Sequence, residues 1–275
     1  MDEREASFDR YAEAYRDWWA PVIADSAVGL LDRLTPLIPG DERIRILDVG
    51  TGTGTLALAA LERWWRGTVT AVEPSRVMLQ LAAEAAALRG DGVVDRLRLT
   101  RGWADSLPVR DAAVDLVISS FVIQLVPSRI AAVREMHRTL RPGGLCAVLT
   151  WQAEREPFEP DDIVTRTFDE LDLEVPAGGP DPRPYTTPAA AATEFRRAGF
   201  HRVHAQIEWL EHQFTPESYV DLVEHWTEDD VFGRLDEAAR ANVRRRLLRS
   251  FQRLDRAALL WRRPLISVLG QRPGA

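Results

Sequence analysis

The stretch at residues 46–58, ILDVGTGTGTLAL, decides the fold of this 275-residue chain. An apolar strand runs into Gly50, Gly52 and Gly54, and an apolar helix begins directly after them. Glycine permits positive φ and removes the side chains that would keep a ligand away from the backbone. We therefore expect a strand, a tight turn and a helix whose first backbone N–H groups face a ligand.

The alternation of strand and helix continues along the chain. Apolar runs predict strands at residues 44–49, 68–73, 97–101, 114–119 and 145–151. Amphipathic spacing predicts helices at 55–65, 75–88 and 129–140. Further on, the pattern predicts a helix at 188–198, a strand at 203–210, a helix at 235–259 and a strand at 265–269. Val-, Ile- and Leu-rich strands separated by helices are typical of a parallel sheet covered on both faces.

The amino-acid composition is that of a globular protein and argues against several other classes of protein. Apolar residues make up 45% and charged residues 28%, as in ordinary globular proteins. No run approaches the roughly 18 apolar residues of a membrane span, and the acidic start predicts no secretory leader. The one cysteine, Cys146, excludes an intrachain disulfide and a cysteine-based metal cluster. We expect a soluble, cytoplasmic protein without a metal and without a membrane partner.

The charge balance and the basic residue types exclude some classes of ligand and partner. Acidic residues outnumber basic ones by 42 to 35, a formal charge of −7, which opposes nucleic-acid binding. All basic residues are arginine, so lysine Schiff bases and the P-loop lysine are excluded. The glycine spacing is G-x-G-x-G rather than the dinucleotide G-x-G-x-x-G, although a glycine-rich turn by itself discriminates weakly.

Three acids discriminate better between the two cofactors that suit such a turn. Asp48 precedes the turn, Glu73 ends the second predicted strand and Asp105 follows the third, so all come to the carboxyl edge of the sheet. A dinucleotide brings two pyrophosphate charges, whereas S-adenosylmethionine brings a sulfonium, an ammonium and one carboxylate. Each charge pair contributes roughly 1 to 4 kcal/mol, depending on screening. The acids therefore favour S-adenosylmethionine, while Glu73 suits the ribose of either cofactor.

Six segments occur in a fixed order: FDRYAEAY (8–15), ILDVGTGTG (46–54), AVEPS (71–75), GWADSLP (102–108), VDLVISSF (114–121) and LRPGG (140–144). Together they resemble the class I S-adenosylmethionine-dependent methyltransferases, of the small-molecule type that includes the ubiquinone and menaquinone C-methyltransferases. The resemblance covers about residues 8–151. It implies an α/β fold with a Rossmann-like, seven-stranded, mostly parallel sheet whose last strand is antiparallel, with helices on both faces, an N-terminal helical cap and lid insertions.

The resemblance also implies domain limits and cofactor contacts. Residues 1–40 would form the cap, 41–152 the cofactor-binding core, and 153–275 the remainder of the same domain, with acceptor-binding insertions at 153–187 and 211–258. The methionine part and the ribose edge would be held by Asp48, Gly50, Thr51, Gly52, Thr53 and Gly54. Glu73, beside Pro74, would take the ribose hydroxyls, and Met78 would pack near the adenine.

The adenine site departs from the family pattern. Ala104 and Asp105 would meet the adenine edge, and Ser120 lies where the loop after the fourth strand touches the cofactor. Where the family often reads Gly-Asp-Ala, this chain reads Gly102-Trp103-Ala104. Either Asp105 replaces the missing acid, or Trp103 stacks on the purine.

We expect the cap to contain two helices divided at Pro21. Its aromatic residues suggest how the site is closed. In the family such a helix folds over the cofactor. The aromatic residues of this helix either anchor it to the domain or close the site, with Tyr15 and Trp19 over the cofactor and Tyr11 reaching the acceptor. The two interpretations are compatible. Trp226, in a presumed lid, is a further acceptor candidate.

Two polar residues are candidates for handling the acceptor. His212 follows a strand whose carboxyl end is expected to open on the acceptor pocket, which makes it the candidate general base. Gln124, after the fourth strand, either orients the acceptor or caps a turn.

The function that follows is S-adenosylmethionine-dependent methyl transfer, leaving S-adenosylhomocysteine, to a small, partly apolar or aromatic acceptor in secondary-metabolite or quinone-like biosynthesis. Oxygen, nitrogen and carbon acceptors stay open, and so does the choice between monomer and homodimer. The alternative is a relative that binds the cofactor but catalyses another reaction, such as cyclisation. A macromolecular substrate and a nicotinamide dehydrogenase are the weaker rivals.

Overall fold

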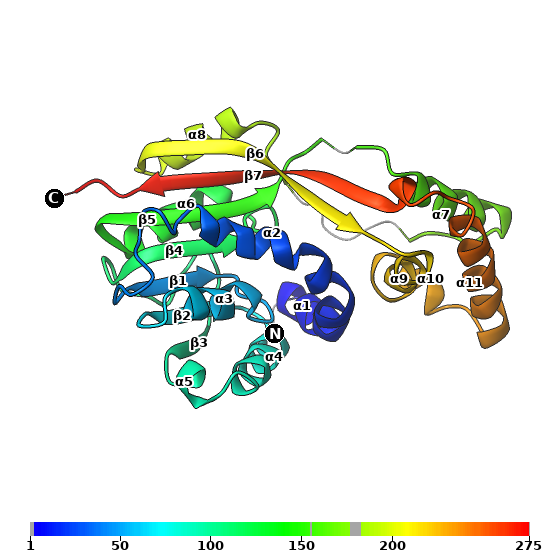
Figure 1. Ribbon diagram of the computed structural model, residues 1–275, viewed down its shortest axis with the longest axis horizontal. Coiled ribbons are helices and arrows are strands. Elements are labelled where there is room, and N and C mark those ends of the chain that lie inside the picture. Colours follow the sequence, from blue (N-terminus) through cyan, green and yellow to red (C-terminus); the bar gives the residue numbers. More distant parts are fainter. Residues whose placement is uncertain (1–2, 155, 177–182, 275) are drawn as a thin grey trace.

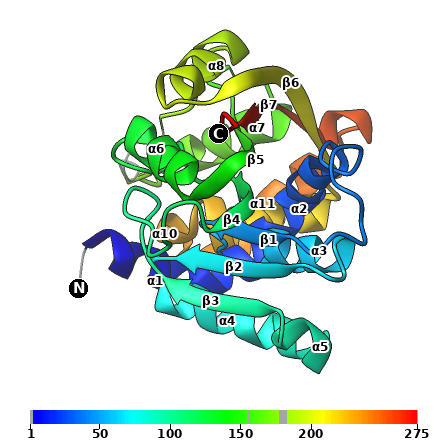
Figure 2. The same cartoon turned by 90° about the vertical axis from the view of Figure 1, so that its left-hand side faces the viewer.

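A seven-stranded sheet in the order β3-β2-β1-β4-β5-β7-β6 forms the centre of the computed structural model, which describes residues 3–154, 156–176 and 183–274 (Figures 1 and 2). Its strands are β1 (Arg45–Val49), β2 (Thr68–Glu73), β3 (Leu97–Arg101), β4 (Val114–Ser120), β5 (Leu140–Trp151), β6 (His201–Gln213) and β7 (Leu260–Gln271). Neighbours are parallel except β7, which is antiparallel to β5 and β6. The predicted Rossmann-like sheet with an antiparallel last strand is confirmed.

Helical segments lie on both faces and beyond one end of the sheet. They are α1 (Glu3–Ala14), η1 (Tyr15–Trp19), α2 (Ala20–Asp32), α3 (Thr55–Arg63), α4 (Arg76–Ala87), α5 (Asp91–Val94), α6 (Arg129–Thr139), α7 (Glu159–Glu170), α8 (Pro188–Arg197), α9 (Pro216–Leu222), η2 (Val223–Thr227), α10 (Asp229–Phe232), α11 (Glu237–Phe251) and η3 (Ala257–Leu259). Both η1 and η2 are π-helical turns, and η3 is a 3-10 turn. None of the helices in the described ranges is long and apolar enough to cross a membrane.

Alternate residues of the strands supply the two apolar layers. In β1, Ile46 packs with α2 and α3 in one buried cluster, while Leu47 and Val49 belong to a second cluster with α6 and α8. Such alternation follows from the two-residue period of a strand, and it makes both faces of the central strands apolar. The buried sheet fixes the carboxyl ends of β1, β2 and β4 side by side, which is where the functional residues lie.

The N-terminal cap differs from the prediction of two helices divided at Pro21. The backbone stays helical from α1 through α2, and the irregularity is the π-helical turn η1. Pro21 instead lies in the first turn of α2, directly after η1, where its missing N–H removes one bond of the continuous helix without ending it. Wide turns of this kind are frequent at functional sites, and η1 carries Tyr15 and Trp19.

The C-terminal half departs further from the sequence prediction. The strands β6 and β7 are longer than the predicted 203–210 and 265–269, because their ends pair with each other well beyond the sheet. The predicted helix at 235–259 already ends at Phe251. The segment at 153–187, expected to be an acceptor-binding insertion, contains α7, whose buried Ile163, Val164 and Phe168 follow helical spacing.

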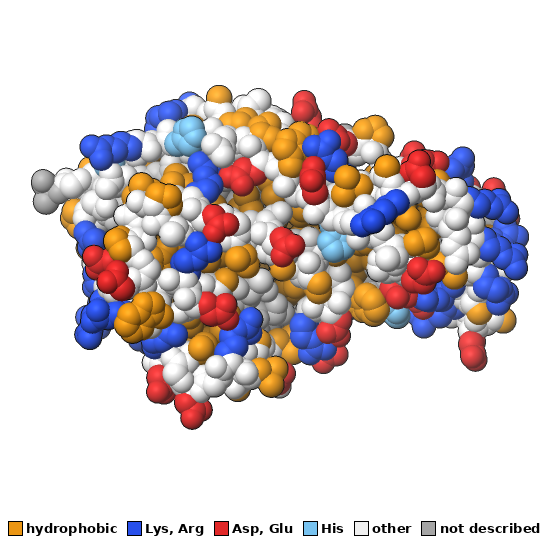
Figure 3. Space-filling view, in the orientation of Figure 1, with side chains coloured by type: hydrophobic (Ala, Val, Ile, Leu, Met, Phe, Trp, Pro, Cys, Tyr) orange, Lys and Arg blue, Asp and Glu red, His pale blue; other side chains and the backbone are white. Residues whose placement is uncertain are grey.

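The long ends of β6 and β7 lead to a helical lobe of α7, α9, α10 and α11 at one end of the molecule (Figure 1). Ion pairs fasten η2 to α11 in this lobe: the buried Glu224 pairs with Arg240 and Arg244, and Arg244 also contacts Asp221 at 2.7 Å. Other arginines of α11 form the blue surface at this end of Figure 3. The lobe brings η2, with Trp226, against η1 of the cap.

Candidate functional site

The glycine turn after β1 is shaped by close approach to its neighbours. Gly50, Gly52 and Gly54 have φ of 71°, 54° and 90°, in the region that favours glycine. A Cβ at Gly50 would come within 2.3 Å of the Val122 side chain, in the loop that follows β4. A Cβ at Gly52 would instead face Tyr15, at 3.7 Å from its ring. The turn is therefore packed between the β4 loop and η1.

Four backbone N–H groups of this turn donate to acceptors within the protein and do not face a ligand. Gly50 and Thr51 donate to the Val72 carbonyl at 2.8 and 3.0 Å, and Gly54 donates to the Thr51 carbonyl at 2.9 Å. Gly52 donates to Glu73 Oε2 at 3.1 Å. Because these donors are already used, the turn does not present them as a cradle for a pyrophosphate.

Two buried carboxylates lie at this turn. Glu73 Oε1 accepts a further N–H from Ser75 at 3.1 Å, and burial still raises the pKa of Glu73 to about 7. Burial also raises the pKa of Asp48 to about 7, and Asp48 Oδ2 is buried without a hydrogen-bond partner. The buried Thr51 hydroxyl and the Ala57 N–H act on Asp48 in the opposite sense and lower its pKa, but burial is the larger effect. Buried acids with raised pKa values are characteristic of functional sites, and a cation is the ligand that would compensate their charge.

A cavity of about 340 Å³ opens at the carboxyl edge of the sheet, beside this turn. Predicted site residues that line it are Tyr11, Tyr15, Trp19, Gly50, Gly52, Glu73, Pro74, Met78, Trp103, Ala104, Asp105, Ser120, Gln124 and Trp226. A second, much smaller cavity of about 20 Å³ is lined by Thr51, Gly50, Tyr15, Ser120 and the start of α3. Three predicted site residues line neither cavity: Asp48, Thr53 and Gly54.

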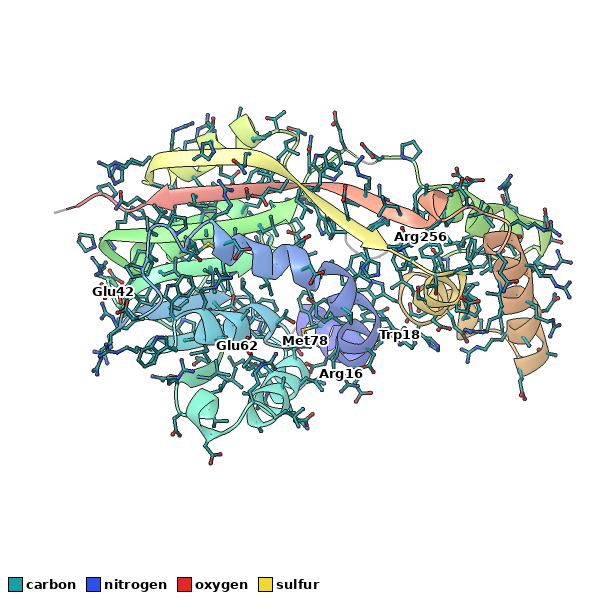
Figure 4. The ribbon with its side chains drawn as sticks, viewed as in Figure 1. Arg16, Trp18, Glu42, Glu62, Met78 and Arg256 are labelled. Carbon is teal, nitrogen blue, oxygen red and sulfur yellow. The ribbon has the colours of Figure 1, made fainter. Side chains whose placement is uncertain are left out.

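The cap is fastened over the cavity by a polar contact with the start of α4. Ser75, the N-cap of α4, accepts from the Met78 N–H at 3.0 Å and donates its hydroxyl proton to Asp9 Oδ1 of α1 at 2.5 Å. Figure 4 shows Met78 where α4 meets α1. Tyr15 then lies above Gly52, and burial followed by the charges of Glu73 and Asp48 raises the pKa of Tyr15 above its usual range. The phenol is therefore uncharged at neutral pH.

Aromatic rings from four parts of the chain close the rest of the cavity. Trp19 and Trp226 stack at 5.8 Å with an interplanar angle of 16°, and Tyr11 and Tyr15 meet Trp226 edge-on at 6.4 and 5.8 Å. Apart from Trp103, a predicted adenine contact, the aromatic residues that line the cavity are called the aromatic chamber below: Phe8, Tyr11, Tyr15, Trp19, Phe121, Trp151 and Trp226. On the other side of η1, Trp18 points toward α9 and stacks on His225 (Figure 4). The cap rings thus both anchor the helix and line the cavity.

Gln124 lines the cavity but its amide is held by the protein. Its Nε2 donates to the Phe121 carbonyl at 2.6 Å, and its Oε1 accepts from the Thr150 hydroxyl at 2.7 Å. The side chain is buried. Gln124 therefore fixes the loop after β4 at the carboxyl end of β5, as the turn-capping alternative predicts.

His212 does not reach the cavity, and its predicted position is corrected here. It lies within β6, opposite Trp261 of β7, and its ring packs at 4.5 Å against Phe214. Burial lowers the pKa of His212. The prediction failed because β6 continues past residue 210 in the two-stranded extension toward the helical lobe, so its carboxyl end lies away from the sheet edge.

Several residues that line the cavity were not predicted from the sequence. They are Phe8, Ile23, Gly102, Phe121, Val122, Leu125, Val126, Pro127 and Trp151. The segment at 121–127 and Trp151 follow or end β4 and β5, so the rule that ligands bind at the carboxyl ends of parallel strands could have found them. Nothing in the spacing of Ile23, on α2, distinguishes it from a core residue.

Comparison with known proteins supports the geometry. A family model described as a methyltransferase domain matches residues 47–148. The malonyl-acyl-carrier-protein O-methyltransferase of Pectobacterium atrosepticum is 34% identical over 122 residues, which are 43% of this chain and 43% of that relative. The chain spans 43% to 47% of the length of four such curated relatives.

Two further likenesses cover more of the chain. The solved structure of the cyclase SpnF has a TM-score of 0.57 and 21% identity, covering 90% of this chain and 82% of that one, a likeness of fold alone. The demethylmenaquinone methyltransferase of Lactiplantibacillus plantarum is 32% identical over 173 residues, which are 58% of this chain and 72% of that relative. The chain belongs to the class I S-adenosylmethionine-dependent methyltransferases and resembles their ubiquinone and menaquinone group.

Proposed function

We propose that this protein transfers the methyl group of S-adenosylmethionine to a small, partly apolar or aromatic acceptor, in the biosynthesis of a secondary metabolite. The observation that carries the proposal is the juxtaposition of two buried, uncompensated carboxylates with the aromatic chamber. A cationic cofactor compensates the acids, and the rings accommodate an apolar acceptor beside it.

The residues present fit this cofactor. Glu73 has two lone-pair sites left after accepting the N–H groups of Gly52 and Ser75, and these can accept the two ribose hydroxyls. Asp48 lines neither cavity, so its buried carboxylate would compensate the positive end of the methionine part by its charge, from behind Gly50 and Thr51, rather than by contact. Trp103 and Asp105 both line the cavity, so either of the two predicted adenine contacts can form.

The chain's own contribution to the reaction is placement and exclusion of water. Bound S-adenosylmethionine supplies the electrophilic methyl group of an in-line displacement. Holding both partners in a near-attack arrangement can lower the barrier by roughly 7 to 11 kcal/mol. Tyr15, Trp19 and Trp226 close the chamber over the glycine turn and exclude water.

The substrate in the name of one relative is malonyl-acyl-carrier protein. We do not extend that substrate to this chain. A free carboxylate acceptor needs a cation, and the described residues that line the cavity include no arginine and no histidine.

A second candidate function is cyclisation or another non-methylating reaction. The cyclase SpnF has the same fold, and an aromatic chamber without a base also suits a reaction that needs only confinement. Incubation with S-adenosylmethionine carrying a radiolabelled methyl group separates the two. Label appearing in an acceptor product supports methyl transfer. Conversion of an acceptor with the label retained on the cofactor supports the alternative.

A further inference from the structure

The side chains that line the cavity carry an unusual set of charges. Among the described residues of the lining, the acidic side chains are Glu73 and Asp105, and there is no arginine and no histidine. The loop at 121–127 contributes Val122, Leu125 and other apolar side chains, and the chamber contributes rings. The acceptor therefore meets no cation and no imidazole base in this lining.

Just outside the lining lie both acids and the Arg10 guanidinium, which is 5.2 Å from the centre of the Tyr11 ring. Tyr11 lies near Asp229 and Asp230 of α10; burial and then these two acids raise the pKa of its phenol, while Arg10 acts in the opposite sense. At the other end, burial and then Glu73 and Asp48 raise the pKa of Tyr15. Both phenols of the chamber thus lie where negative charge outweighs positive charge.

Each class of nucleophile makes a different demand on this chamber. A carboxylate, phosphate or phenolate acceptor would be an anion desolvated among rings and acids, with no cation to pair it. An alcohol or an acidic carbon has to give up a proton during transfer, and a general base has to be within hydrogen-bond reach. The two carboxylates of the lining, Glu73 and Asp105, are the ones proposed to hold the cofactor, so neither is available to the acceptor as that base. An amine in its uncharged form makes neither demand, because its lone pair is free before the reaction.

Resting on the proposed function, we propose that the acceptor nucleophile is the uncharged nitrogen of an amine on an apolar or aromatic scaffold, and that the chamber rejects anionic acceptors. The nitrogen lone pair forms the new N–C bond while the C–S bond breaks with its electron pair left on sulfur. The positive charge therefore moves from sulfur to nitrogen and no new charge is created. A proton leaves the product ammonium for water after transfer.

The aromatic rings also stabilise the positive charge after it has moved to the acceptor nitrogen. A cation within about 6 Å of a Trp or Tyr ring is attracted by the electrons of the ring face, and Trp is the strongest of these partners. Trp19 and Trp226 present stacked rings, and Tyr11 and Tyr15 surround the edge of Trp226. The product ammonium is accordingly held by rings and acids rather than by a single counter-ion.

The test compares three probes of one size: benzylamine, benzyl alcohol and benzoate. Tryptophan fluorescence measures their binding to the protein saturated with S-adenosylhomocysteine at pH 7.5, where benzylamine is an ammonium ion, so this arm tests which sign of charge the chamber accepts. We expect benzylamine to bind at least about tenfold more tightly than benzoate, the size of one unpaired charge near a protein surface. With S-adenosylmethionine at pH 9, mass spectrometry is expected to find N-methylbenzylamine and no methyl benzoate.

A variant pair isolates the role of charge. Leu125 lines the cavity and is 50% exposed, so an arginine fits there without burial. Leu125→Arg is expected to tighten benzoate and weaken benzylamine, which reduces their ratio at least about tenfold. Leu37 is 55% exposed and lies outside the lining, so Leu37→Arg adds the same charge as a control and leaves the ratio unchanged.

The outcomes separate this proposal from the one on which it rests. Benzoate or benzyl alcohol binding as tightly as benzylamine, or no binding of benzylamine, would overturn the amine proposal while S-adenosylhomocysteine still binds. An equal response of the probe ratio to Leu37→Arg and Leu125→Arg would overturn it as well. Failure of S-adenosylhomocysteine to bind would instead overturn the proposed function itself.

Discussion

Glu73→Gln is expected to weaken cofactor binding clearly while changing the free energy of unfolding only a little. The carboxylate has a pKa raised to about 7 by burial, against an ordinary value of 4.5. Because the folded pKa lies above the unfolded one, ionised Glu73 costs stability as pH rises through 7, by about 3 kcal/mol well above that pH. Glutamine removes this cost.

Glutamine also removes one acceptor. The carboxylate accepts N–H groups from Gly52 and Ser75, whereas the amide oxygen can accept from one of them, and leaving a buried donor unpaired costs about 1 to 3 kcal/mol. The two effects oppose each other, so we expect the free energy of unfolding of Glu73→Gln at pH 8 to change by less than about 2 kcal/mol. The loss of cofactor affinity, in contrast, is not offset by a second effect of the substitution.

Loss of hydrogen bonds from the ribose to a charged acceptor weakens binding by about 1.5 to 3 kcal/mol, or roughly 10- to 150-fold in Kd. Titration calorimetry with S-adenosylhomocysteine measures this change, and urea unfolding measures stability. Glu62→Gln, on the exposed face of α3 (Figure 4), is the control and is expected to leave Kd unchanged. Unchanged Kd in Glu73→Gln would refute the placement of the ribose.

Three further predictions concern the acids, the cap and the glycine turn. Because Asp48 and Glu73 have pKa values raised to about 7 and a cation favours their ionised forms, the rise in Tm caused by S-adenosylmethionine is expected to be larger at pH 8 than at pH 6, and the uncharged sulfur of S-adenosylhomocysteine to give a smaller dependence. Asp9→Ala removes the acceptor of the Ser75 hydroxyl and is expected to speed limited proteolysis of α1 and cost about 1 to 2 kcal/mol. Gly50→Ala places a methyl 2.3 Å from a side chain of the β4 loop at φ of 71°, so thermal unfolding is expected to show a loss of about 2 kcal/mol or more.

Each of these has an outcome that contradicts it. An equal rise in Tm at both pH values would show that the two acids do not respond to the cofactor. Proteolysis of Asp9→Ala at the wild-type rate would show that the contact does not hold the cap. Gly92, where an added methyl meets nothing within 4 Å, is the control for the glycine turn; an equal effect of both alanine substitutions on Tm would refute the steric reason.

The sheet could be predicted from the sequence because its information is local. Apolar runs occur before Gly50 and at β2, β3 and β4. Because predicted helices separate most of these runs, each is interpreted as a strand of a parallel sheet. The position of Glu73 at the end of β2 follows from the same regularity, since parallel strands end at one edge.

The acceptor side could not be predicted in the same way. Trp226 meets Trp19 because ion pairs between Glu224 and α11 position η2, and no local pattern encodes that contact. His212 was misplaced because the length of β6 is set by its pairing with β7. The hydrogen bonds from the Gly50 N–H to the Val72 carbonyl and from the Gly52 N–H to Glu73 could not be predicted for the same reason: they depend on contacts between β1 and β2.

The most direct test of the central claim is titration calorimetry of the wild-type chain with S-adenosylmethionine and, separately, with NADH. The account predicts that S-adenosylmethionine binds to one site per chain and that NADH gives no binding heat, because the acids repel a pyrophosphate and the glycine N–H groups are already used. Saturable binding of NADH without binding of S-adenosylmethionine would contradict it.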